Sequence, residues 1–183
     1  MVRRGSADTV MSPLDAALVG EASNPPPPAG AGSPVLVLGV GNVIMGDEGV
    51  GIHALRMLEL GPIADGVRLL DGGTAGINLL EDIQNARVVV MIDATRDGRP
   101  AGSIALHRPE SVGALPHGLS AHDLGIKDLF AAAALLGKMP VIYLFTVSVE
   151  TVKPMSLELS PPVAAAVPEV AEAVSALVAG LAG

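Results

Sequence analysis

The sequence predicts an α/β fold: three layers, with a doubly wound, mostly parallel twisted sheet of about five strands and helices on both faces. Two observations support this prediction. Residues 35–40 and 88–92 are continuous apolar runs, and continuous apolarity indicates a strand that is buried on both faces, as in a parallel sheet. Helical segments separate the predicted strands, which implies right-handed crossovers between parallel neighbours.

Each remaining element follows from its local pattern of apolar residues and glycines. Strands are expected at 35–40, 67–70, 88–92, 103–106 and 141–149. Helices are expected at 49–60, 77–84, 123–137 and 162–181, the last with an irregularity near Pro168. Residues 34–183 then form a single α/β domain.

The first 33 residues differ from the rest of the chain. A four-proline run at 25–28 is followed by Ala-Gly-Ala-Gly-Ser, and such a segment favours extended conformations that do not pack into a core. We therefore expect residues 1–33 to be a flexible extension with at most a short helical piece near residues 14–19.

Composition excludes several classes of function. The chain of 183 residues carries 11 basic and 19 acidic residues, a formal net charge of −8. Nucleic acid is not an expected partner, because binding its phosphates requires a clustered basic face. Cysteine is absent, which excludes disulfides, thiolate metal sites and a cysteine nucleophile. Any metal must therefore be held by oxygen and nitrogen ligands.

Hydropathy gives no expectation of a membrane. The most apolar stretch, 129–149, is interrupted by Lys138 and Pro140, and a spanning helix needs about 20 predominantly apolar residues. Arg3 and Arg4 are not followed by the apolar region of a signal peptide. We expect a cytoplasmic monomer that does not contact a membrane.

Polar residues follow the predicted strands, at the sheet edge where α/β proteins form their sites. Glu48 lies in the glycine-rich loop after the first strand, Asp71 begins the loop after the second, and Asp93 ends the third. His122 lies in the loop that follows the fourth strand. The acidic and imidazole groups are thus expected to collect at one edge.

Structural explanations for these residues stay open at this point. Acids at a helix N-terminus are favoured by the helix dipole, which would account for Glu48. Asp71 could form a turn, Asp93 could cap the following turn, and His122 could neighbour a helix cap. The other histidines are expected to be structural or exposed: His53, His107 and His117.

The first glycine loop also invites comparison with a dinucleotide-binding loop. Gly39 and Gly41 match that motif, but Ile44 occupies the position of its third glycine. The acids that follow would repel a pyrophosphate, so a cation fits better. Glu48, Asp93 and His122 would supply two oxygens and one nitrogen, leaving coordination positions open for a catalytic or recognition metal such as Zn²⁺ or Ni²⁺.

Four blocks of sequence together resemble the maturation endopeptidases of nickel–iron hydrogenases. They are Val37-Leu38-Gly39-Val40-Gly41-Asn42 with Asp47-Glu48-Gly49-Val50-Gly51, Asp71-Gly72-Gly73-Thr74-Ala75-Gly76, Asp93-Ala94, and Ser120-Ala121-His122-Asp123-Leu124-Gly125. Their order and spacing agree with the family over about residues 34–180. The chain departs from the family in its extension, in Val149 where many members have proline, and in Glu158 where glycine is usual.

The resemblance implies a function. Family members remove a short C-terminal extension from the hydrogenase large-subunit precursor after nickel has been inserted. Their metal-contacting residues correspond to Glu48, Asp93 and His122, and the nickel is expected to come from the substrate, without an organic cofactor. The resemblance also makes Asp71, together with Glu48 and Asp93, a candidate for catalysis, of either an aspartyl or a metal-dependent type. Two other functions stay open: a nucleotide-binding Rossmann-like domain, and a non-catalytic nickel-sensing assembly factor.

Overall fold

The computed structural model describes residues 35–116, 118–119, 123–151 and 154–182, with the side chains of 123–125 and 182 left undescribed. The predicted extension at 1–33 and the candidate ligand His122 lie outside the described residues. The described chain forms a five-stranded sheet in the order β2-β1-β3-β5-β4. Its strands are β1 (Val35–Val40), β2 (Val67–Gly73), β3 (Val88–Thr95), β4 (Ile104–His107) and β5 (Val141–Ser148).

The predicted α/β class is confirmed, and the sheet is parallel except at one edge. β1 pairs in parallel with β2 and β3, and β3 pairs in parallel with β5, whereas β4 runs antiparallel to β5. Two strands extend past their predicted ends at residues 70 and 92: β2 reaches Gly73 and β3 reaches Thr95. Asp71 and Asp93 therefore lie within strands rather than after them.

The direction of β4 corrects one step of the sequence reasoning. Ile104 pairs with Val147 and His107 with Leu144, so the carboxyl end of β4 points away from the carboxyl ends of the parallel strands. The segment that follows β4 therefore does not emerge directly at the expected edge. The chain returns there through residues 118 and 119: Arg96 N–H donates to the Gly118 carbonyl at 2.6 Å, and Leu119 forms an isolated bridge with Thr95.

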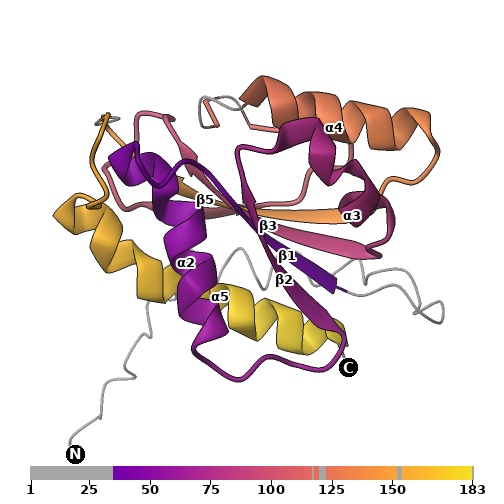
Figure 1. The fold of residues 1–183 in the computed structure, drawn as a ribbon, viewed down its shortest axis with the longest axis horizontal. Coiled ribbons are helices and arrows are strands. Elements are labelled where there is room, and N and C mark those ends of the chain that lie inside the picture. The colour runs from indigo at the N-terminus through magenta and orange to yellow at the C-terminus, as the bar shows by residue number, and fades with distance from the viewer. Residues whose placement is uncertain (1–34, 117, 120–122, 152–153, 183) are drawn as a thin grey trace, which may run out of the picture.

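Helices cover both faces of the sheet, as predicted (Figure 1). One face carries α2 (Val50–Glu59) and α5 (Pro161–Ala182), and the other carries α3 (Leu80–Gln84) and α4 (Asp123–Leu135). Short 3-10 turns precede α2 and α3, namely η1 (Gly46–Gly49) and η2 (Gly76–Leu79), and a third, η3 (Val112–Ala114), follows β4.

The apolar strands divide their side chains between two cores. Along β3, Val88, Val90 and Ile92 face α2 and α5, while Val89 and Met91 face α3 and α4. All five are fully buried, which is why the sequence of this strand is continuously apolar instead of alternating.

One described helix, α5, is long and apolar enough to span a membrane by length and composition, with a mean hydropathy of 1.5 over Pro161–Leu181. This helix lies outside residues 129–149, the stretch on which the expectation from sequence rests. In the structure one side of α5 packs into the core through residues that include Val163, Val170 and Val174. The helix continues through Pro168, which lies on its exposed side, where water can bond the carbonyl that proline leaves without a donor.

Candidate functional site

The loop between β1 and α2 is folded tightly onto itself by glycine. Gly41 has a φ of +133°, and a Cβ there would overlap the carbonyl oxygen of Glu48. Asn42 N–H donates to the same carbonyl at 3.3 Å. The glycine therefore lets the loop close on the backbone of Glu48.

A second glycine brings the start of α2 onto the sheet edge. A Cβ on Gly51 would overlap the carbonyl oxygens of Val40, which ends β1, and of Ile92, which directly precedes Asp93 in β3. η1, which carries Glu48, packs against β3, which carries Asp93. The structure therefore places these two predicted site residues on elements that are in contact.

Both carboxylates are buried. Glu48 is 4% exposed and Asp93 is fully buried. Asp93 Oδ1 accepts a hydrogen bond from the N–H of Ala94 at 2.8 Å. Because Ile92 and Ala94 face α2 and α5, the alternation of the strand places Asp93 on the α4 face. Burying a carboxylate costs several kcal/mol unless charge or hydrogen bonds compensate, so two buried acids on neighbouring elements favour a cation.

Asp47, beside Glu48, has a different role. Its Oδ1 accepts from the backbone N–H of Ser160 at 2.6 Å and its Oδ2 from the hydroxyl of Ser160 at 2.8 Å. Ser160 directly precedes α5, and its carbonyl accepts the N–H of Ala164 at 2.8 Å. Asp47 thus ties η1 to the start of α5, a role that the sequence analysis did not foresee.

Asp71 lies apart from the buried pair. It is exposed, and its Oδ1 accepts the N–H of Gly73 at 3.0 Å, as in a turn formed by an aspartate. It pairs with Gly39, whose missing Cβ would contact Leu55 of α2. The register therefore places Asp71 on the α2 face, whereas Asp93 lies on the α4 face.

The third predicted ligand, His122, falls outside the described residues. The last described residues before it, Gly118 and Leu119, pair with the end of β3. Among the described residues no group of three or more histidine, aspartate or glutamate side chains could hold a metal ion. A three-residue metal site therefore depends on His122, which stays a prediction.

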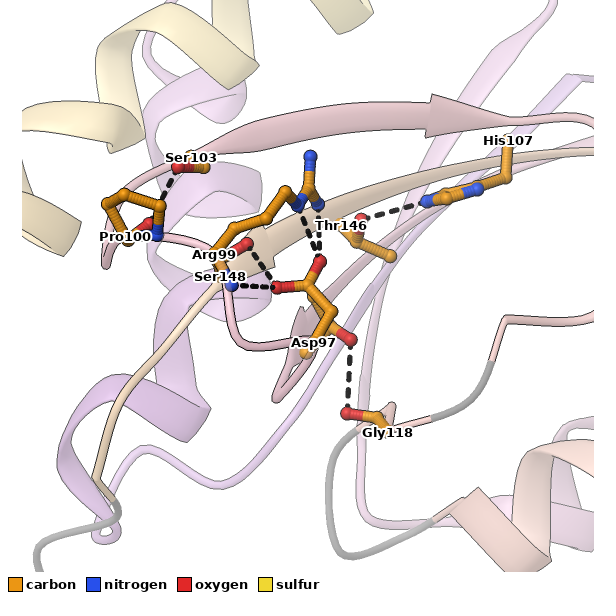
Figure 2. Close-up of polar contacts among 9 residues, drawn as sticks. Asp97, Arg99, Pro100, Ser103, His107, Gly118, Thr146 and Ser148 are labelled. Atoms are coloured by element: carbon orange, nitrogen blue, oxygen red, sulfur yellow. Dashed lines mark hydrogen bonds and ion pairs between the residues drawn. The ribbon is translucent and has the colours of Figure 1, made fainter.

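A polar network that the sequence analysis missed joins β5 to β4 and to the loop after β3 (Figure 2). Thr146, the partner of Asp93 in register, is fully buried, and its hydroxyl is 3.1 Å from Nε2 of His107. Ser148, also fully buried, donates to Asp97 at 2.9 Å. The signal was present in the sequence, because Thr146 and Ser148 alternate with apolar residues in β5.

Two groups of this network have shifted pKa values. Burial lowers the pKa of His107, the charge of Arg99 lowers it further, and Asp97 opposes both. Burial raises the pKa of Asp97, but hydrogen bonds from Arg99 and Ser148 outweigh it, so the net pKa is below its usual value. Arg99 Nε donates to Asp97 at 2.7 Å. At neutral pH the network therefore holds a neutral imidazole and an ion pair.

On α2, His53 has a buried Nε2 that meets no hydrogen-bond partner among the described residues. Burial, aided by the charge of Arg56, lowers the pKa of this imidazole. The imidazole of His53 is thus neutral at pH 7.

The family model described as "Hydrogenase maturation protease" matches residues 53–177 of the chain. Two curated relatives are each 39% identical over 109 residues, which is 58% of this chain. They are the hydrogenase 2 maturation protease of Escherichia coli (strain K12), 66% of whose length is covered, and the hydrogenase expression/formation protein HupD of Rhodobacter capsulatus, 52% of whose length is covered. The chain thus spans between half and two thirds of the length of these relatives.

Solved structures show the same fold over more of the chain. The hydrogenase maturating endopeptidase HybD from E. coli superposes with a TM-score of 0.74 at 32% identity, covering 80% of this chain and 93% of that one. The [NiFe] hydrogenase maturation protease HybD from Thermococcus kodakarensis superposes with a TM-score of 0.64 at 28% identity, covering 79% and 98%. The described fold is therefore close to the complete fold of both structures.

Proposed function

The chain belongs to the hydrogenase maturation protease family, and on this basis we propose that it is an endopeptidase that shortens the hydrogenase large-subunit precursor at its C-terminal extension. The observation that carries the proposal is the pair of buried carboxylates, Glu48 and Asp93, on elements that pack together at the carboxyl edge of the sheet. We propose that it works in the cytoplasm as a monomer, without an organic cofactor.

The buried acids have a chemical role in this proposal. The chain has no cysteine nucleophile, and in this proposal the attacking group in peptide hydrolysis is an activated water. A metal ion can lower the pKa of a bound water or polarise a carbonyl. Glu48 and Asp93, with His122 as the third ligand, would hold the nickel of the precursor and so place the scissile bond beside them.

Asp71 would act on the substrate from the α2 face of the sheet, whereas Asp93 lies on the α4 face. It is exposed and fixed by its bond to Gly73, so its second carboxylate oxygen is available to orient a water or a substrate amide. We propose this role in recognition or catalysis as secondary to that of the buried pair.

The two other functions receive less support. The space beside Gly41 that a pyrophosphate would approach is filled by the carbonyl of Glu48, and a nucleotide phosphate would meet the buried acid. A non-catalytic nickel-sensing factor would use the same ligands. It differs from a protease only in that the precursor keeps its full length.

The decisive experiment is the mass of the nickel-loaded precursor before and after incubation with the purified protein. We expect the precursor to lose a C-terminal peptide. A nickel-free precursor should stay intact, also when soluble nickel is added with the protease, because the open metal site binds the cation together with the substrate. An unchanged mass of the nickel-loaded precursor would contradict the protease function, whereas cleavage of the nickel-free precursor would contradict only the nickel requirement.

A further inference from the structure

Three large apolar side chains are exposed beside the candidate site. Ile44 is 48% exposed, Leu157 is 67% exposed and Met155 is 89% exposed. They come from two loops, the one between β1 and η1 and the one that precedes α5. We call these three residues the apolar rim.

The two loops are fixed to one another by their backbones. Gly46 N–H donates to the Ser156 carbonyl at 2.8 Å, and Ser156 N–H donates to the Ile44 carbonyl at 3.1 Å. Met155 has a φ of +59°, a left-handed conformation that is uncommon for a residue other than glycine. The backbone bonds thus fix the two loop segments that carry the exposed apolar side chains, and the backbone of Met155 is in an uncommon conformation.

The rim is continuous with the candidate site. The loop that carries Ile44 closes through the bond between Asn42 N–H and the Glu48 carbonyl, at 3.3 Å. A pocket of about 300 Å³ opens beside the rim, lined by residues that include Asp47, Ser156 and Glu158. Among the described residues its lining includes the acids Asp47 and Glu158 and no basic residue, so a negatively charged segment would be repelled there.

We infer that the apolar rim docks the part of the precursor next to the scissile bond, and that this part is apolar and lacks acidic residues; the inference rests on the proposed function. Ile44 and Glu48 belong to one closed loop, so a peptide that is bound at Glu48 lies against the loop that carries Ile44. A second copy of this chain is a less suitable occupant, since a stable interface buries about 800 Å² on each partner and three side chains offer much less.

The test removes apolarity from the rim and leaves the acids intact. The double variant Met155→Asn with Leu157→Gln keeps a residue that tolerates the left-handed conformation at position 155. Leu60→Gln is the matched control, because Leu60 is 88% exposed but follows the far end of α2. With the nickel-loaded precursor, we expect KM to rise by about tenfold or more in the double variant, with kcat unchanged and the control equal to wild type.

Binding of a nickel-loaded precursor in which proline follows the scissile bond, so that it is not cleaved, separates this inference from the protease function and leaves both acids in place. A weaker Kd for the double variant than for Leu60→Gln supports the rim even where the wild-type protein leaves the precursor intact. Equal Kd values, or equal KM values during active processing, would overturn it. If the melting temperature of the double variant is lower than that of the wild type, the single variants Leu157→Gln and Met155→Leu are compared instead. Only Leu157→Gln should then weaken binding of the precursor.

Discussion

Asp47 and Ser160, 113 positions apart in the chain, are joined by two hydrogen bonds to a single carboxylate. One bond comes from the backbone N–H of Ser160 and the other from its hydroxyl, at 2.6 and 2.8 Å. The carboxylate is 7% exposed, and hydrogen bonds to charged groups are stronger than neutral ones. This contact fixes the turn that carries Glu48 to the helix that covers one face of the sheet.

Replacing Asp47 by alanine should lower the free energy of unfolding by about 1–3 kcal/mol, because a backbone N–H and a hydroxyl lose their charged acceptor. Ser160→Ala should cost less, since the backbone bond stays. The two changes should be less than additive in a double-mutant cycle followed by urea unfolding. The exposed Glu59→Gln serves as the control, and additive effects of Asp47→Ala and Ser160→Ala would show that the contact is not energetically coupled.

Glu48→Gln and Asp93→Asn should each reduce processing of the nickel-loaded precursor to background while the far-ultraviolet circular dichroism stays that of the wild type. Both changes keep the shape of the side chain and remove the negative charge that would hold a cation. Processing is followed by the mass of the precursor, with Glu59→Gln as a charge-matched control. Wild-type processing by either folded variant would remove that carboxylate from the reaction.

Two glycine-to-alanine changes should act in opposite directions. At Gly51 a Cβ would overlap the carbonyls of Val40 and Ile92, so Gly51→Ala should destabilise the fold and displace α2. Around Gly180, in α5, no atom lies within 4 Å of the added Cβ, so Gly180→Ala should stabilise by about 0.5–1 kcal/mol through helix propensity. Thermal melting of both variants checks the prediction, and equal shifts of the melting temperature would contradict it.

Stability should fall on acidification below about pH 6.5, partly through His107. Its ordinary pKa is 6.5, and burial followed by the charge of Arg99 lowers the pKa in the folded state. Between the two pKa values the unfolded chain binds more protons at His107 than the folded chain does. The contribution of His107 to stability is therefore fully present above pH 6.5 and is lost as the pH falls through the pKa of the folded state. His107→Gln should therefore lose less stability than wild type between pH 7 and pH 5 in urea titrations. An identical pH slope for both proteins would exclude this contribution of His107.

The parts of the fold that were predictable are those with a local cause. β3 is a continuous apolar run because both of its faces are covered, and its existence could be predicted from residues 88–92 alone. Its last three residues, Asp93 to Thr95, could not be assigned to the strand, because they are polar or small and gain their place by pairing with β5.

The parts that escaped prediction depend on partners far along the chain. The direction of β4 follows from its pairing with β5, about which its own four residues hold no information. Nothing near Asp47 indicates that it binds Ser160 while its neighbour Glu48 lies at the site. The sequence predicts Asp71 and Asp93 at the same edge of the sheet. Only the pairing of Asp71 with Gly39 shows that Asp71 lies on the opposite face of the sheet from Asp93.

α5 packs against β1, β5 and α2, and it is made after every other element of the described chain. During synthesis on the ribosome, the turn that carries Glu48 therefore emerges long before Ser160 and α5 can hold it. The carboxylate edge reaches its final form only when this helix has left the exit tunnel and docked on the sheet. A shortened nascent chain that lacks α5 would thus contain both buried acids of the site in sequence but not in their finished arrangement.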